Sequence, residues 1–129
     1  MLTENQIHDF KKQLNVRFGE LQEEIRLELL KSDDQHFIDL AGRVHDRGEE
    51  SVADLLVDLQ LASVDRHIQE IRDIDAAVTR IAAGRYGVCI DCDDTITVDR
   101  LKAYPTAKRC QLCQTEYERL HAGRKGPSL

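Results

Sequence analysis

The sequence predicts a mainly α-helical protein: a long antiparallel helical hairpin (a coiled coil) followed by a small four-cysteine zinc-finger module with a C-terminal helix. Two observations carry this prediction. Apolar residues recur at helical spacing over residues 7–29 and again over residues 52–81, and the only four cysteines form two C-x-x-C pairs. We therefore expect a hairpin over residues 1–83, a zinc-finger module and C-terminal helix over residues 84–122, and a flexible tail over residues 123–129.

The first helix is expected over residues 4–31. Thr3, followed three positions later by Gln6, fits a capping box at its start. No proline and a single glycine, Gly19, interrupt the stretch. Its apolar residues follow one another at steps of three and four, which is the spacing of one helical face: Ile7, Phe10, Leu14, Phe18, Leu21, Ile25 and Leu29.

The second helix is expected over residues 52–83. Ser51 is suited to cap its start, and Gly84 is suited to end it in the left-handed conformation. Two amphipathic helices joined by about twenty residues favour an antiparallel hairpin, although a dimeric bundle would bury the same stripes. The apolar stripe of this helix changes register once, after Ala62, and consists of Val52, Leu55, Leu59, Ala62, Val64, Ile68, Ile71, Ile74, Val78 and Ile81.

The connector between the two helices is strongly acidic. A charged connector of this kind is most often a solvated loop, and in a hairpin it lies at the far end. The apolar run at residues 37–41 is compatible with part of a helical turn. We therefore predict an acidic tip at residues 32–51. Its charges are six acidic side chains, Asp33, Asp34, Asp39, Asp46, Glu49 and Glu50, and two basic ones, Arg43 and Arg47.

The cysteines are spaced as in a zinc site. Cys89 and Cys92 form one pair, and Cys110 and Cys113 follow after seventeen residues, a separation typical of two knuckles that share one Zn²⁺. Two disulfides would suit a secreted protein, but no signal peptide opens the chain. A redox dithiol would be expected in a βαβ setting, which is missing. We predict one structural Zn²⁺, because four thiolates leave no open coordination position.

Charge and motifs limit the possible functions. The net charge is −6, whereas contact with DNA phosphates requires a concentrated basic face. No run of about 18 apolar residues predicts a membrane span. No phosphate-binding glycine loop or catalytic motif indicates an enzyme. In the zinc region, five basic side chains oppose four acidic ones: Arg85, Arg100, Lys102, Lys108 and Arg109 against Asp91, Asp93, Asp94 and Asp99.

The residues around the cysteines carry a family resemblance. Residues 84–89 read GRYGVC, Ile96 follows, and residues 100–113 read RLKAYPTAKRCQLC. This pattern resembles the DksA/TraR zinc-finger family. The resemblance implies a zinc module from which a coiled coil projects, and a cytoplasmic, non-enzymatic regulator of transcription in the stringent response. It further implies binding to bacterial RNA polymerase through the secondary channel by the coiled-coil tip, without direct DNA binding and often together with ppGpp.

Two parts of the chain depart from the family pattern. Where active members carry D-x-x-D-x-A at the tip, this chain has Asp46, Glu49 and Ser51. The resemblance makes Arg66 a possible ppGpp or polymerase contact, but Tyr104 and Gln114 occupy positions that are often basic. Because phosphate recognition depends on charged donors, we expect no strong ppGpp synergy. The altered tip leaves an alternative open, namely a family member with weak or no polymerase effect whose zinc module serves protein interaction.

Overall fold

The computed structural model describes residues 2–31, 33–46 and 62–121 of the chain. Predictions for Glu49, Ser51, the start of the second helix and the tail lie outside these residues. The described part is helical, which confirms the mainly α prediction, and its β-structure is one isolated bridge between Val88 and Thr95. The helices are α1 (Glu4–Leu30), α2 (Gln35–Asp46), α4 (Ala62–Ala82), α5 (Val98–Ala103) and α6 (Gln111–Leu120).

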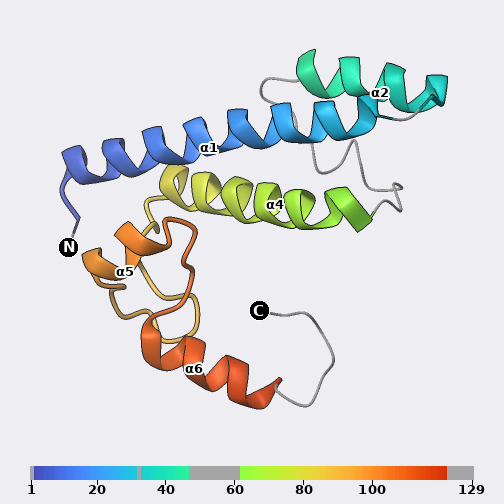
Figure 1. Cartoon of the computed structure of the whole chain (residues 1–129). Helices are drawn as coiled ribbons and strands as arrows, with labels where there is room; N and C mark the ends of the chain where they lie inside the picture. Colours follow the sequence, from blue (N-terminus) through green and yellow to red (C-terminus); the bar gives the residue numbers. More distant parts are fainter. Residues whose placement is uncertain (1, 32, 47–61, 122–129) are drawn as a thin grey trace.

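Helices α1 and α4 lie side by side and antiparallel, and we call this pair the helical arm (Figure 1). The predicted capping box at the start of α1 is present, with Thr3 and Gln6 bonded reciprocally. The apolar stripes meet because each helix can bury its face only against another element. Buried residues along the arm are Phe10, Leu14, Leu21, Ile25 and Leu29 from α1 and Val64, Ile71, Ile74 and Ala77 from α4.

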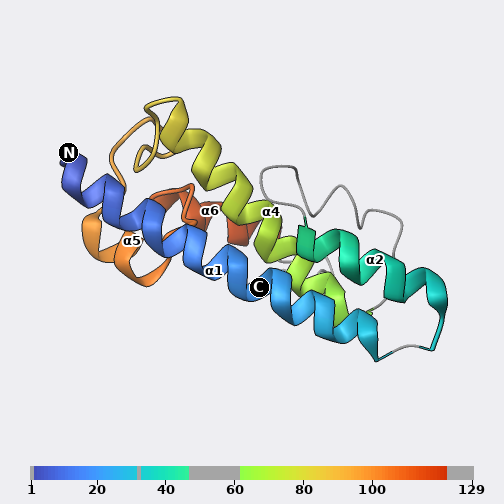
Figure 2. The ribbon, with the colours of Figure 1, turned by 90° about the horizontal axis from the view of Figure 1, so that it is seen from above.

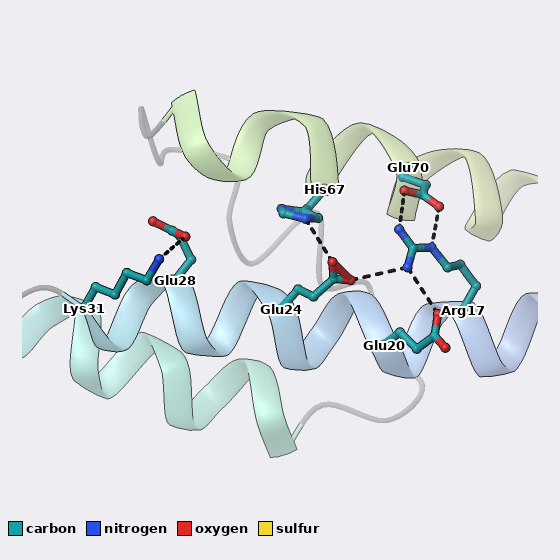
Figure 3. A network of polar contacts seen from close by, with 7 residues as sticks. All are labelled: Arg17, Glu20, Glu24, Glu28, Lys31, His67 and Glu70. Carbon is teal, nitrogen blue, oxygen red and sulfur yellow. Dashed lines mark hydrogen bonds and ion pairs between the residues drawn. The ribbon is translucent and has the colours of Figure 1, made fainter.

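A charge network also joins the two helices of the arm (Figure 3). The Arg17 guanidinium donates to both carboxylate oxygens of Glu70, with Nε to Oε2 at 2.6 Å and Nη2 to Oε1 at 3.0 Å. Arg17 also contacts Glu20 and Glu24 on its own helix, and Glu24 pairs with His67 of α4 at 3.4 Å. Because the Arg17–Glu70 pair is bidentate, it favours one register of α1 against α4.

The described part of the connector, residues 33–46, differs from the predicted solvated loop. Residues 35–46 form helix α2, which runs back along the C-terminal half of α1 instead of extending the far end of the arm (Figures 1 and 2). Leu40, Ala41 and Val44 are buried, and Gln22 Nε2 donates to the Val44 carbonyl at 3.1 Å. The physical reason is an apolar face at helical spacing, which the high charge of the connector obscured.

The zinc module follows α4 through a left-handed glycine, as predicted. Gly84 has φ +73°, and the Arg85 amide donates to the Arg80 carbonyl at 2.8 Å, which closes the end of the helix. Thr97 caps α5 by accepting from the Arg100 amide at 3.2 Å.

The predicted C-terminal helix is α6, which begins at Gln111 with Cys110 as its N-cap. Among the helices in the described ranges, none has the length and apolar character that a membrane span requires.

Candidate zinc centre

The four cysteines come together at one point of the zinc module. Their Sγ atoms all lie within 4.8 Å of one another, and Cys92 and Cys110 are 3.8 Å apart. A tetrahedral zinc ion with Zn–S bonds of about 2.3 Å requires sulfur–sulfur separations of about 3.8 Å. The arrangement therefore fits zinc. Cys89 is fully buried, and Cys92 is the exposed member of the set.

Local backbone structure places each pair. In the first knuckle the Cys89 amide donates to the Asp94 carbonyl at 2.8 Å, and Asp93 adopts a left-handed φ of 62° that turns the chain back. In the second knuckle Cys110 caps α6, and its Sγ accepts from the Cys113 amide at 3.5 Å. The Ile90 amide donates to the Lys108 carbonyl at 2.9 Å and ties the two knuckles together.

The protein surroundings act in opposite directions on the thiols. Burial alone would raise the pKa of Cys89, but backbone N–H donors, that of Cys110 foremost, outweigh burial and lower it to about 6. The pKa of Cys113 is raised well above its ordinary value, chiefly by its hydrogen bond with Cys110. Four sulfurs this close cannot all carry negative charge without a cation between them. Bound zinc supplies that charge and closes the tetrahedron, so the site is structural.

The other predicted site residues lie apart from the cysteines. Asp46 is the last residue of α2. It follows Val44 by two positions, and the Val44 carbonyl accepts a hydrogen bond from Gln22 of α1. The backbone of Asp46 therefore lies beside α1. Arg66 is exposed near the N-terminal end of α4, roughly 24 Å along the helix axis from Ala82. It is therefore far along the arm from the junction with the zinc module.

Tyr104 and Gln114, at the two positions that are often basic in the family, lie within the part of the chain that the structure describes. Tyr104 is 61% exposed, with the Arg100 guanidinium 5.7 Å above its ring. Gln114 is half-buried, and its side chain donates to Glu118 at 2.9 Å. Neither residue carries a positive charge that would recognise a phosphate.

Sequence reasoning missed a contact between the two knuckles. Asp91 and Arg109 entered it only as charges to be counted, yet they form an ion pair with Nε to Oδ2 at 2.7 Å. The available signal was their placement, because Asp91 lies between the first two cysteines and Arg109 directly precedes the third. Opposite charges at such positions are brought together when the knuckles meet.

Comparison with known proteins agrees with this geometry. The family model for the prokaryotic dksA/traR C4-type zinc finger matches residues 84–119, which contain all four cysteines. The prediction of a zinc cofactor is thereby confirmed.

The similarity extends beyond the finger. The RNA polymerase-binding transcription factor DksA of Haemophilus influenzae is 30% identical over 116 residues, which is 88% of this chain and 75% of the relative. The protein of the same name from Buchnera aphidicola is 32% identical over 88% of this chain and 72% of its own length. The structure of transcription factor DksA2 from Pseudomonas aeruginosa aligns with a TM-score of 0.61 and 28% identity, and covers 92% of this chain and 88% of that one.

Proposed function

Because the chain belongs to the DksA/TraR zinc-finger family, we propose that it binds bacterial RNA polymerase and regulates transcription in the cytoplasm without enzymatic chemistry of its own. The observation that carries this proposal is the extent of the likeness. The alignment with the Haemophilus influenzae relative covers 88% of this chain, so it includes the arm as well as the finger. A shared zinc knuckle alone would say little about function, because function depends on the whole site.

The charge of the molecule supports a protein partner. The net charge is −6, and the zinc region carries nearly balanced charges. Contacts to DNA phosphates depend on clustered lysine and arginine side chains. We therefore assign the finger a structural role at the base of the arm and no direct contact with DNA.

The finer proposal is entry of the arm into the secondary channel of the polymerase. A long, narrow, antiparallel helix pair is a suitable shape for a channel, and the predicted contacts are Asp46, Glu49 and Ser51. In the described structure α2 lies along α1. For Asp46 to lead the arm, α2 must leave α1, and burial of Leu40, Ala41 and Val44 opposes this by roughly 3–6 kcal/mol. Polymerase binding must supply that free energy.

The docked α2 also favours a second candidate function. A family member whose Asp46 stays beside α1 would have a weak polymerase effect or none, and its zinc module would serve another protein. The replaced tip residues favour the same weak or absent effect. Glu49 stands in place of aspartate, and its extra methylene can misplace a contact that depends on about an ångström. Ser51 stands in place of alanine. Arg66 lies far along the arm from the zinc module that contains Tyr104 and Gln114, and neither of these two residues is basic. We therefore expect no strong ppGpp synergy.

Competition binding tests the leading proposal. Purified polymerase holoenzyme is expected to retain the zinc-loaded chain at micromolar concentration, and a Gre-type factor that occupies the secondary channel is expected to displace it. Absence of binding rejects the proposal. Binding that a Gre-type factor does not reduce rejects the channel while leaving a polymerase partner.

Restoring the tip separates the two candidates. The double variant Glu49→Asp with Ser51→Ala is compared with Asp33→Asn, which removes one exposed carboxylate from the turn between α1 and α2. In a transcription assay run with and without ppGpp, a gain of effect in the double variant alone locates the defect at the tip. No gain favours the protein-interaction module.

A further inference from the structure

Helix α6 leaves the zinc centre with little packing to support it. None of its residues is buried, and Leu112 and Leu120 are 82% and 63% exposed. It lies apart from α1 and α4 (Figure 1), and the substantial helix–helix contacts among the described residues are those of α1 with α2 and α4. A helix of ten residues is marginal on its own in water. Its direction must therefore be set by something other than core burial.

Arg109 directly precedes the second knuckle, and its side chain contacts the first knuckle and the body of α6. Its Nε donates to Asp91 Oδ2 at 2.7 Å, and its Cζ lies 3.9 Å from the centroid of the Tyr117 ring. The Arg109 side chain is only 12% exposed. Its own backbone carbonyl accepts from Arg100 Nε at 3.0 Å, which fixes the strand of chain that enters the second knuckle. A planar guanidinium can pair with a carboxylate at its edge and stack on a ring with its face.

The ion pair reaches a zinc ligand through one residue. Asp91 lies within the first C-x-x-C pair, and its backbone amide donates to the Sγ of the buried Cys89 at 3.4 Å. Holding the Asp91 side chain therefore holds the N–H group that stabilises the thiolate. Partners of this kind, one step removed from the metal, orient the ligands, and their removal weakens metal binding about 10- to 100-fold. At the α6 end of this chain of contacts, the Tyr117 ring also stacks on His121, with ring centroids 4.1 Å apart.

We propose that Arg109 is a positioning residue that holds α6 and the second zinc knuckle against the first knuckle. By doing so it slows zinc release and sets the direction of α6. A second ion pair in the same module provides the comparison. Arg85 Nη2 and Asp93 Oδ1 are also 2.7 Å apart, but their side chains are 57% and 78% exposed. Within the described ranges, the Arg85 guanidinium stacks on no aromatic ring. An exposed pair of this type contributes little, whereas Arg109 is shielded and contacts two elements.

The rate of zinc release tests whether Arg109 slows loss of the metal. The zinc-loaded full chain is mixed with an excess of a chelator whose absorbance changes when it binds zinc. The rate of zinc transfer is measured for Arg109→Met and for the matched control Arg85→Met. Arg109→Met is expected to release zinc about 10-fold faster, because loss of such a partner weakens metal binding by at least about 10-fold and a weaker site releases its metal faster. The control is expected to stay within about twofold of the parent chain. Equal rates in the two variants overturn the proposal.

Hydrogen exchange of α6 amides, with zinc kept saturating, tests whether Arg109 sets the direction of α6. Arg109→Met and Tyr117→Leu should each speed exchange over the last turns of α6, and Arg85→Met should not. Arg109→Lys keeps a charge for Asp91 but no flat face for Tyr117, so it should restore slow zinc release and leave α6 exchange fast. If Arg109→Met fails to load zinc, Asp91→Asn replaces it, and a release rate equal to that of the parent chain then rejects the proposal.

Discussion

At Gly87 of the zinc module, the backbone lies close to the side chain of Leu2 near the N-terminus. The φ of Gly87 is +83°, and a Cβ there would lie 2.8 Å from Cδ1 of Leu2. Gly84 shares the left-handed conformation, with φ +73°, but a Cβ on it would meet nothing within 4 Å. The two glycines are therefore required for different reasons. Gly84 is required by its backbone angle alone, and Gly87 by its angle together with the close approach of Leu2.

Alanine at these positions separates the two reasons. Left-handed strain should lower the free energy of unfolding by about 1–2 kcal/mol in both Gly84→Ala and Gly87→Ala. Gly87→Ala should lose up to roughly 1 kcal/mol more, because the half-buried Leu2 side chain must move away from the new Cβ. Denaturant unfolding with saturating zinc measures both values. Equal losses would show that Leu2 adjusts without cost.

At the scale of elements, the arm combines apolar burial with one bidentate ion pair. The hydrogen bond from Arg17 lowers the pKa of Glu70 below its ordinary value. A carboxyl whose pKa is lowered by folding contributes stability that is fully present above its unfolded pKa and is lost as the pH falls through the folded pKa. For Glu70 the loss therefore begins below about pH 4.5. Both side chains are about 40% exposed, so solvent screening keeps the contribution small.

Glu70→Gln tests this pair. Near neutral pH the variant should lose about 0.5–1 kcal/mol of unfolding free energy. The loss should shrink as the pH falls below about 4.5, because Glu70 then takes up a proton first in the unfolded parent chain and, at lower pH, in the folded chain as well. Unfolding curves between pH 3 and pH 7 supply the measurement. Glu28→Gln is the control, since Glu28 pairs with Lys31 within the C-terminal end of α1 and its cap and does not join the two helices. A loss that does not change with pH contradicts the assignment.

Helix α2 shows how much an element depends on its neighbour. Leu40 is 5% exposed against α1, whereas Ile38 of the same helix is 37% exposed. Leu40→Ala should weaken docking of α2 by about 2–3 kcal/mol, and Ile38→Ala should have a much smaller effect. Hydrogen exchange of the α2 amides reports the docked fraction. Similar exchange in both variants would mean that α2 does not use this face.

For the whole molecule, the zinc ion and the arm are separate sources of stability. The arm has its own apolar contacts, such as Leu21 and Ile25 of α1 and Ile71 of α4, all fully buried. The zinc module has few buried side chains, and its knuckles depend on the metal. The two parts meet where Phe10 of α1 packs against Tyr86, with ring centroids 5.7 Å apart.

Zinc removal should therefore unfold one part of the molecule. Chelation, or Cys89→Ser, is expected to abolish zinc binding and to melt α5 and α6, because metal binding and folding are coupled in small metal domains. Most helical signal from α1 and α4 should remain. Zinc stoichiometry together with far-ultraviolet circular dichroism checks both parts. Retained zinc with an unchanged melting profile, or complete loss of helical signal, would each contradict this division.

The sequence by itself determined the features whose physical cause is local. The steps of three and four along α1 require a helix, Thr3 and Gln6 cap it, Gly84 ends α4, and the spacing of the cysteines defines the zinc site. Each of these depends on residues a few positions apart or on a metal with fixed geometry. They could be predicted, and the family resemblance rested on the same residues.

Only the tertiary structure decided what each surface contacts. The apolar face of α2 had to be buried, but its pattern did not say that α1 would cover it or that Asp46 would lie beside the arm. Arg17 with Glu70, and Arg109 with Asp91 and Tyr117, are distant in sequence or on different elements, and no periodicity relates them. Such contacts depend on how helices and knuckles are placed in space, which a single sequence does not encode in any local pattern.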